Sequence, residues 1–278
     1  MQTGPSLGPR RLPKARSTNE YQRGSYATIL LYAIARFGKT NLLRQLLKAG
    51  YKPLVLSVGE MGDSRGLTTV ADLDIPVVEV DDWDTAKVVC AELKKGKYDG
   101  HEFDVIFNDS LTGFGYIWTA SGLKALGWDE IGVAGAGKDT RQIYSYIPEK
   151  GRQTMNMLFD IPAHLVCICR EGLTEEGEGK SKITYPCPEL PGQKLNRELP
   201  GWPDAVVYGK FFNGKRVFLT EAEGKTIAGI RMPEGTRFPK YMQADLSLLI
   251  KGMKGDLDAI EASKIPSATP TRPTVNAK

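Results

Sequence analysis

The sequence predicts an α/β fold, in which a mostly parallel sheet lies between two layers of helices and an antiparallel hairpin extends the sheet near its C-terminal end. Two observations predict it. Short, continuously apolar runs, typical of buried parallel strands, alternate with segments whose apolar residues follow helical spacing. In addition, Asn213-Gly214 separates two strand-like runs, 205–212 and 215–220, which is the strongest short-range signal for a hairpin.

The first part of the chain shows this alternation clearly. The apolar run at 27–32 predicts a buried strand. A helix follows, because leucines recur at the spacing of one helix face, at Leu42, Leu43, Leu46 and Leu47. Gly50 is a suitable end for this helix. The runs 54–58 and 75–80 predict the second and third strands.

The same pattern continues toward the middle of the chain. Residues 86–93 follow helical spacing, and 103–107 predicts a fourth strand. A further helix is expected around 140–159, before a fifth strand at 163–169. Strands separated by helices in this way imply parallel pairing, so the final hairpin extends the main sheet and forms no second domain.

Length and composition limit the class of protein. The 278 residues are 41% hydrophobic and 25% charged, which provides for a sizeable core and excludes wholesale disorder. No run approaches the roughly 18 apolar residues that a membrane span needs, and the first residues contain no apolar secretory signal. Four cysteines are too few for a disulfide scaffold. We therefore expect a cytoplasmic protein without a membrane partner.

The positive charge is concentrated at the two ends of the chain. Of a net charge of +4, residues 1–24 carry +4 and residues 265–278 carry +2, so about −2 remains for the rest. The ends are also rich in Pro, Ser and Thr. We predict a disordered basic tail (1–24), one folded domain (25–250), and a short helix with a disordered Pro/Thr-rich tail (251–278). Basic tails can contact nucleic acid, although solvated ends without function have the same composition.

A phosphate-binding loop is indicated between the first strand and the first helix, where the chain reads Ala33-Ile-Ala-Arg-Phe-Gly38-Lys39-Thr40. A Walker A loop, Gly-x-x-x-x-Gly-Lys-[Ser/Thr], holds phosphates with its backbone N–H groups and lysine, and ligates Mg²⁺ with the hydroxyl. Every position matches except the first, where Ala33 replaces glycine. The alternative is a strand–turn–helix that contains Gly-Lys-Thr by chance. The predicted nucleotide-binding residues are Ala33, Ile34, Ala35, Arg36, Phe37, Gly38, Lys39, Thr40 and Asn41.

Two acidic residues are placed to complete this chemistry. Asp109 follows an apolar run and is expected at the carboxyl end of its strand, where ligands bind in open parallel sheets. It should therefore converge with Lys39 and ligate Mg²⁺ together with Thr40. Glu60 follows the second strand and could polarise the attacking water, the alternative being a solvated loop glutamate.

These residues carry a family resemblance. The Gly-Lys-Thr loop, together with the segments KPLVLSVGE, DIPVVEVDDWD, HEFDVIFNDSLT and PGQKLNRELPGWPD, resembles the phage-encoded RecA-type ATPases of the Sak type over about residues 25–249. The resemblance implies a RecA-like P-loop NTPase core that binds ATP and Mg²⁺. It implies DNA-stimulated ATP hydrolysis that assists homologous recombination or single-strand annealing. The implied partners are single-stranded DNA, a phage single-strand binding or annealing protein, and further copies of this chain.

The resemblance also implies roles for individual residues. Lys39 and Thr40 match the Walker A pair, and Asp109 matches the Walker B acid. Glu60 matches the catalytic glutamate. Arg170, just after the fifth strand, matches a position that senses the γ-phosphate.

Lys194 lies in a segment that resembles one reaching a neighbouring subunit's nucleotide in RecA-like rings and filaments. Two positions depart from the family pattern, since Ala33 replaces the first glycine and Arg36 stands where such loops often have another. These departures favour an alternative function. In that alternative the chain is a degenerate nucleotide-binding scaffold that recruits replication or annealing partners without significant hydrolysis.

Three other segments admit a functional interpretation. Residues 132–139 resemble a second Walker A loop, but Asp139 would repel the phosphates, so a flexible loop is predicted. The polar segment 171–182 is either a hairpin tip or faces a DNA path, as the comparable region does in RecA-like proteins. Buried thiols are expected in place of a zinc site, because no Cys-x-x-Cys pair occurs among His164, Cys167, Cys169 and Cys187.

Overall fold

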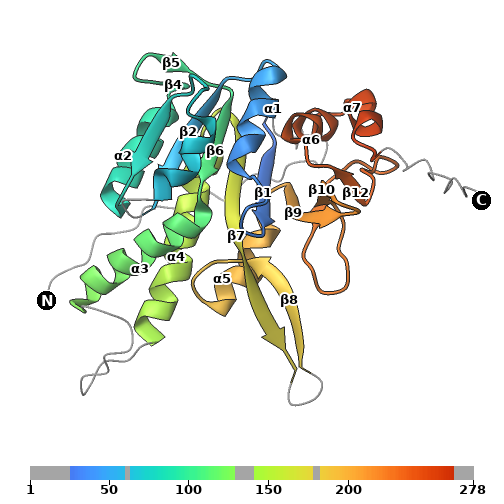
Figure 1. The fold of residues 1–278 in the computed structure, drawn as a ribbon. Helices are drawn as coiled ribbons and strands as arrows, with labels where there is room; N and C mark the ends of the chain where they lie inside the picture. The colour runs from blue at the N-terminus through green and yellow to red at the C-terminus, as the bar shows by residue number, and fades with distance from the viewer. Residues whose placement is uncertain (1–25, 60–62, 129–140, 178–181, 266–278) are drawn as a thin grey trace, which may run out of the picture.

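The central feature of the fold is one twisted sheet with helices on both faces (Figure 1). The computed structural model describes residues 26–59, 63–128, 141–177 and 182–265. Across the sheet the strands follow the order β12-β10-β9-β1-β7-β6-β2-β3, and pairing is parallel from β9 through to β3. The strands are β1 (Thr28–Ala33), β2 (Pro53–Val58), β3 (Val77–Val80), β6 (Val105–Asp109), β7 (His164–Glu176), β9 (Ala205–Phe212), β10 (Lys215–Leu219) and β12 (Tyr241–Gln243).

The C-terminal hairpin extends this sheet on one side. β10 pairs antiparallel with β9 and with β12, so the outer strands reverse the direction of the parallel core. The connecting Asn213 and Gly214 have φ values of 49° and 72°, the left-handed pair that two-residue hairpin turns require. The smaller strands are β4 (Lys97–Tyr98), β5 (His101–Glu102), β8 (Ile183–Pro188), which pairs with β7, and β11 (Gly229–Ile230), which pairs with β9.

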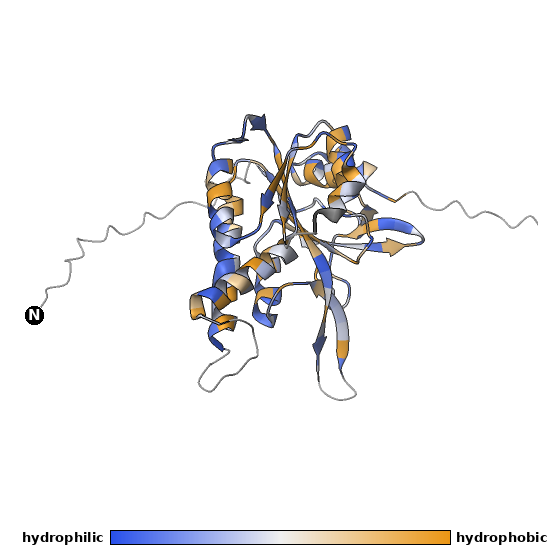
Figure 2. Ribbon diagram, turned by 60° about the vertical axis from the view of Figure 1, so that its left-hand side comes forward, coloured by the Kyte–Doolittle hydropathy of each residue, from blue (hydrophilic) through white to orange (hydrophobic). Residues whose placement is uncertain are grey.

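Helices cover both faces of the sheet and bury two apolar clusters. α1 (Leu43–Lys48), α6 (Leu246–Met253) and α7 (Leu257–Ala262) contribute to one cluster, and α2 (Trp83–Leu93), α3 (Leu111–Leu126), α4 (Arg141–Phe159) and α5 (Gln193–Glu198) contribute to the other. Short 3-10 helices at Thr40–Leu42, Asp63–Val70 and Leu199–Gly201 complete the described elements. Figure 2 shows hydrophobic residues both on the central strands and on the helices beside them, as expected for a sheet buried on both faces.

The predicted α/β fold with a parallel core and an antiparallel hairpin is therefore confirmed, but one long helix was not predicted. α3 begins directly after β6, in a segment for which the sequence suggests no helix. Its glycines obscure the signal, because glycine is a poor helix former. They are needed for packing: a Cβ at Gly113 would lie 1.9 Å from the carbonyl oxygen of Val58, and one at Gly122 would lie 2.3 Å from Ile143.

The polar segment 171–182 belongs to a hairpin. β7 continues as far as Glu176 and pairs with β8, so half of the expected loop is strand. The proposed domain boundary at residue 250 lies within α6, which packs against α7. Residues 132–139 and both predicted tails, apart from Ile265, lie outside the described residues. None of the described helices combines the length and apolar character needed to cross a bilayer.

Candidate nucleotide-binding site

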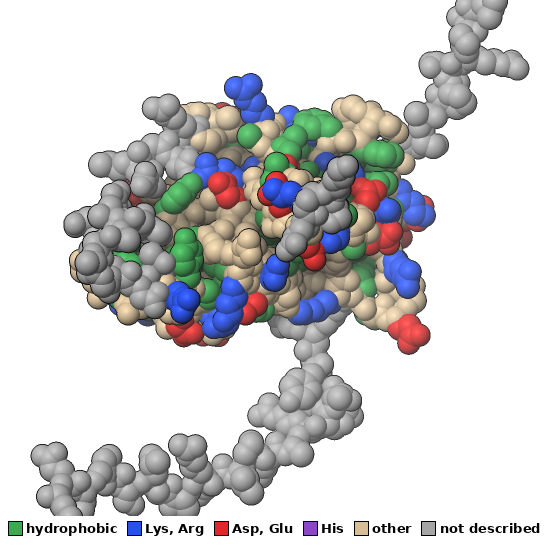
Figure 3. All heavy atoms as spheres, turned by 90° about the horizontal axis from the view of Figure 1, so that it is seen from below, with side chains coloured by type: hydrophobic (Ala, Val, Ile, Leu, Met, Phe, Trp, Pro, Cys, Tyr) green, Lys and Arg blue, Asp and Glu red, His purple; other side chains and the backbone are tan. Residues whose placement is uncertain are grey.

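The predicted phosphate-binding loop lies at the carboxyl edge of the parallel strands. Residues 34–39 connect β1 to the 3-10 turn that precedes α1. β1 lies between β7 and β9, and β6 is the next strand beyond β7. Figure 3 views the molecule from this edge, where Lys and Arg side chains are interspersed with Asp and Glu. The loop, Asp109 at the end of β6 and Arg170 in β7 are thus brought to one edge.

Ala33, the departure from the Walker A pattern, is the last residue of β1 and is fully buried. It pairs in register with Gly209 of β9. A Cβ at Gly209 would lie 2.9 Å from the Ala33 Cβ and 2.8 Å from the ring of Phe37. The methyl group of Ala33 and the ring of Phe37 therefore occupy space that a glycine on the neighbouring strand leaves open. Because Ala33 has strand conformation, an alanine here causes no left-handed backbone strain.

Two residues of the loop have left-handed backbone conformations. Gly38 has φ 88°, which glycine adopts without penalty. Arg36 has φ 62° and is exposed, a conformation that costs a non-glycine residue about 1–2 kcal/mol. Arg36 therefore adopts the conformation for which many such loops use glycine. The loop is anchored between these two residues by Phe37, whose side chain is fully buried.

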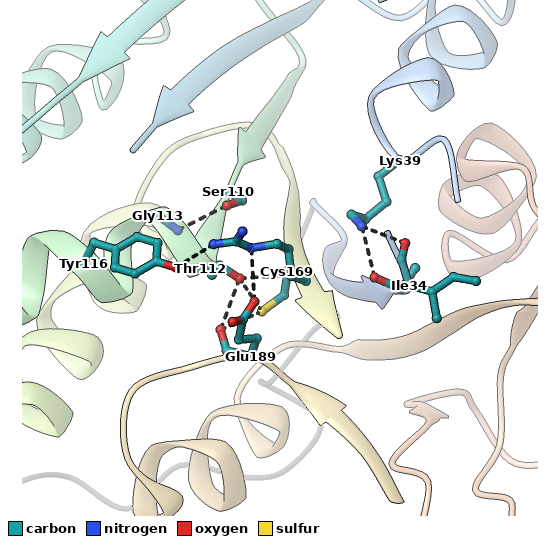
Figure 4. A network of polar contacts seen from close by, with 10 residues as sticks. Ile34, Lys39, Ser110, Thr112, Gly113, Tyr116, Cys169 and Glu189 are labelled. Atoms are coloured by element: carbon teal, nitrogen blue, oxygen red, sulfur yellow. Dashed lines mark hydrogen bonds and ion pairs between the residues drawn. The ribbon is translucent and has the colours of Figure 1, made fainter. Parts of the chain in front are cut away.

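Lys39 folds back onto its own loop. Its ammonium donates hydrogen bonds to the carbonyl oxygens of Ala33 at 3.0 Å and Ile34 at 3.2 Å (Figure 4). Burial lowers the pKa of Lys39, and the nearby carboxylate of Asp109 opposes that shift. A phosphate oxygen would bind this ammonium more strongly than the two neutral carbonyl groups do, because a hydrogen bond between two charged groups is stronger than one to a neutral acceptor.

Thr40 and Asp109 meet across the site. The Thr40 hydroxyl donates to Asp109 Oδ2 at 2.9 Å, although the two residues are 69 positions apart in the chain. Hydroxyl and carboxylate oxygens are the ligands that Mg²⁺ takes when it is bound with a nucleotide. This donor set fits Mg²⁺, which would be held by Thr40 and Asp109 together with phosphate oxygens.

Arg170 is held by two other elements. Its guanidinium donates to the Tyr116 hydroxyl of α3 at 2.6 Å and forms an ion pair with the Glu189 carboxylate at 3.0 Å. Thr112 supports the same network, because its hydroxyl accepts from the Arg170 backbone N–H at 3.0 Å and contacts Cys169 Sγ at 3.2 Å (Figure 4). Arg170 thus stands at the correct edge, with its side chain engaged by α3 and the segment after β8.

Lys194 lies apart from the loop, and Glu60 lies outside the described residues. Lys194 is exposed on α5 and stands 3.9 Å from the carboxylate of Glu198. It lines a groove between α5, α4 and the β7–β8 hairpin. Among the predicted site residues in the described chain, Lys39 contacts Ala33 and Ile34, the Phe37 backbone N–H donates to the Ile34 carbonyl oxygen at 3.3 Å, and Thr40 contacts Asp109.

The structure also adds residues that the sequence did not single out. Glu171, directly after Arg170, accepts a hydrogen bond at 2.6 Å from Tyr208 of β9 and lies close enough to Lys39 to influence its pKa. Burial raises the pKa of Tyr208, whose ring stacks on Tyr32 at 4.9 Å. A polar residue after a buried strand was the available signal for Glu171, but the sequence could not indicate that β9 would supply its partner.

Comparison with known proteins gives one family match. A family model described as an AAA domain matches residues 25–232. No curated protein matches the chain. Among solved structures, the crystal structure of the RadB recombinase is 16% identical, with 73% of this chain and 84% of that chain covered and a TM-score of 0.38. The segment matched by the family model contains the loop, Thr40 and Asp109 and spans most of the chain, so this protein belongs to the AAA domain family.

Proposed function

We propose that the protein binds Mg·ATP at residues 33–41, hydrolyses it, and uses this cycle in DNA recombination or single-strand annealing. The observation that carries the proposal is the hydrogen bond between Thr40 and Asp109, which joins the end of the loop to the end of β6. It unites the two metal-ligating oxygens of a P-loop ATPase at the edge of the sheet where ligands bind.

The chain's own residues divide the chemistry as follows. The N–H groups of the loop and the Lys39 ammonium bind the phosphates, with Lys39 exchanging its contacts to Ala33 and Ile34 for phosphate oxygens. Thr40 and Asp109 hold Mg²⁺, which neutralises phosphate charge when bound. Glu60 orients the attacking water as general base. Arg170 senses the γ-phosphate once the Arg170 guanidinium has released its ion pair with Glu189.

Partners follow from the family resemblance and from the distribution of charge. We propose that single-stranded DNA is contacted by the basic segments 1–24 and 265–278, which carry the excess positive charge. The described edge mixes both signs of charge (Figure 3). A phage single-strand binding or annealing protein is proposed as a second partner, and a homo-oligomer would allow Lys194 to reach the nucleotide of a neighbouring copy.

Two observations favour the alternative of a nucleotide-binding scaffold without significant hydrolysis. The Lys39 ammonium is already hydrogen-bonded to the loop, and Arg36 adopts a left-handed conformation that is unfavourable for a residue other than glycine. Nucleotide binding must break the hydrogen bonds of Lys39 to the loop, and this cost would lower the affinity for the nucleotide.

The test combines binding and turnover in the same variants. Wild type should bind Mg·ATP in calorimetry and hydrolyse it faster when single-stranded DNA is added. Lys39→Ala should weaken ATP binding at least tenfold, because a charged hydrogen bond is worth about 1.5–3 kcal/mol. Lys48→Ala, which removes an exposed lysine of α1, is the matched control and should bind as wild type does.

The two acids are separated by single-turnover measurements. Glu60→Gln should bind Mg·ATP normally and hydrolyse it about 10²–10⁴-fold more slowly, the usual effect of removing a general base. Asp109→Asn should weaken both binding and turnover, because it acts through the metal. If wild type binds ATP but shows no turnover with DNA, the scaffold is the correct function. If wild type binds no ATP, the proposal fails altogether.

A further inference from the structure

The β9–β10 hairpin presents one of its faces to the phosphate-binding loop. Side chains alternate between the two faces of a strand, and cross-strand partners share a face. The pairs Gly209 with Phe218 and Phe211 with Arg216 therefore lie on one face of the hairpin. Gly209 accommodates Ala33 and Phe37, so this face is the one that contacts the loop.

The opposite face of the hairpin has different contacts. Phe212 stacks on Tyr241 with ring centroids 4.4 Å apart, and the Lys210 ammonium lies 5.1 Å from the same ring. Lys215 pairs with Phe212 and shares its face. The opposite face thus carries Phe212 with Lys210 and Lys215, whereas Phe211 and Arg216 lie on the side of the loop together with the buried Phe218.

Arg216 lies directly over the loop. Its Nη1 atom is 3.0 Å from the position that a Cβ on Gly38 would occupy. Within the part of the chain that the structure describes, no carboxylate forms an ion pair with this guanidinium. The planar guanidinium, whose donors form a fixed fork, is suited to bind phosphate oxygens. Arg216 lies over Gly38, the residue that directly precedes Lys39.

Phe211 adds an exposed aromatic surface at the same place. Its ring centroid is 6.1 Å from that of the buried Phe37 in an edge-to-face arrangement, and 49% of Phe211 is exposed. An aromatic ring fixed at its edge by a buried partner keeps a face available for stacking. Nucleobases of any kind stack on such faces.

The order of strands sets the direction of a bound nucleotide. Thr40 and Asp109 meet on the β6 side of β1, and the hairpin lies on the β9 side. A triphosphate held by Thr40 and Asp109 through a metal ion would reach the hairpin if it crossed the loop toward β9. We propose that Arg216 binds the phosphate chain of the nucleotide and that the ring of Phe211 stacks on its base. This inference rests on the proposed function and assigns the nucleoside end of the same site.

The test separates base from phosphate by comparing ATP with inorganic tripolyphosphate, both with Mg²⁺, in calorimetry. Phe211→Ala should weaken ATP binding by roughly tenfold and leave tripolyphosphate binding unchanged, because only ATP has a base to stack. Arg216→Ala should weaken both by about tenfold or more. Phe211→Tyr, which keeps an aromatic face, should bind ATP as wild type does.

Matched controls come from the other face of the hairpin. Phe212→Ala and Lys215→Ala remove the same residue type or the same charge and should leave both affinities unchanged. The inference is overturned if wild type binds ATP in a Thr40- and Asp109-dependent way while Phe211→Ala and Arg216→Ala bind it equally well. It is also overturned if Phe211→Ala loses tripolyphosphate affinity, since that result would show a distorted loop. Failure of wild type to bind ATP would instead contradict the proposed function.

Discussion

Single residues explain how a loop with an unusual sequence keeps its shape. The alanine at position 33 is compatible with the loop because its partner in register on β9 is glycine. Phe37 uses the same open space, so the size of one side chain on β9 determines whether the loop packs on the sheet. Ala33, which distinguishes this loop from the Walker A pattern, thus has room because the residue beside it, 176 positions later in the sequence, is Gly209.

The first prediction tests this match. Gly209→Ala should destabilise the protein by about 1–3 kcal/mol, the usual cost of overpacking, and should weaken ATP binding because the loop is displaced. Adding Ala33→Gly should restore part of both losses, since it removes one of the two close approaches. Gly229→Ala is the control, because a Cβ there meets nothing within 4 Å. Equal melting temperatures and affinities for Gly209→Ala and wild type would contradict the packing described.

Among the elements, α3 shows how close packing fixes the edge of the sheet. Ser110 caps the helix by accepting a hydrogen bond from the Gly113 N–H at 3.1 Å. The backbone of Gly113 lies against the end of β2, and a Cβ there would be 1.9 Å from the Val58 carbonyl oxygen. The helix that follows Asp109 is therefore held against the strand that leads to Glu60.

The second prediction concerns this approach of α3 to β2. Gly113→Ala should lower stability by about 3 kcal/mol or more, the upper end of overpacking costs, because the opposing atoms are backbone and cannot rotate away. Gly201→Ala, at a position where a Cβ meets nothing within 4 Å, should behave as wild type does. Denaturant unfolding measures both. A Gly113→Ala variant as stable as the control would show that α3 does not approach β2 so closely.

A charged cluster joins the outer strands of the sheet. Glu223 accepts hydrogen bonds from Lys210 of β9 and from the Tyr241 hydroxyl of β12. The Lys240 ammonium lies 3.4 Å from Glu223 Oε1. These partners lower the pKa of Glu223 from its usual 4.5 to about 2. The carboxylate is stabilised in the folded state, so its contribution to stability is present above pH 4.5 and is lost as the pH falls toward 2.

The third prediction follows from the lowered pKa of Glu223. Glu223→Gln should melt at a lower temperature than wild type at neutral pH, and the difference should shrink between pH 4.5 and 2. Glu234→Gln, at an exposed glutamate, is the matched control for the loss of one surface carboxylate. Melting curves recorded across this pH range decide the matter, and a difference that persists at pH 2 would exclude the carboxylate as its cause.

At the scale of the whole molecule, the positive charge is concentrated in the two terminal segments of the chain. Residues 25–264 carry about −2, whereas the two terminal segments carry +6 together. Figure 3 shows mixed charge at the edge where the loop lies. Long-range attraction to a polyanion must therefore come mainly from the terminal segments.

The fourth prediction uses this separation. Deleting residues 1–24 and 265–278 should weaken binding to single-stranded DNA and flatten its salt dependence, by about 0.7 in the log–log slope for every phosphate that the deleted segments neutralise. ATP binding should be unchanged, which serves as the internal control for folding. An unchanged slope would place the DNA-binding surface on residues 25–264, and the groove lined by Lys182 and Lys194 would then be the region to mutate.

Much of the fold, and the residues proposed for the candidate site, could be predicted from local sequence. Buried parallel strands are apolar along their whole length, and Asn-Gly requires a particular turn, so β1, β6 and the final hairpin follow from a few residues each. The Gly-Lys-Thr loop and Asp109 were predicted in the same way, because each lies at the end of a recognisable strand. α3 was missed, since glycines that weaken a helix locally are required by neighbours that are distant in sequence.

The sequence by itself determined the alternation of strands and helices, the loop and the acidic strand end. Only the tertiary structure decided that Gly209 lies beside Ala33, that Glu189 and Tyr116 hold Arg170, and that Arg216 lies over Gly38. The physical reason is that hydrophobic periodicity is a local property, whereas strand order and register are not. A strand's pattern shows that it is buried, but its neighbours are selected by the packing of the whole sheet.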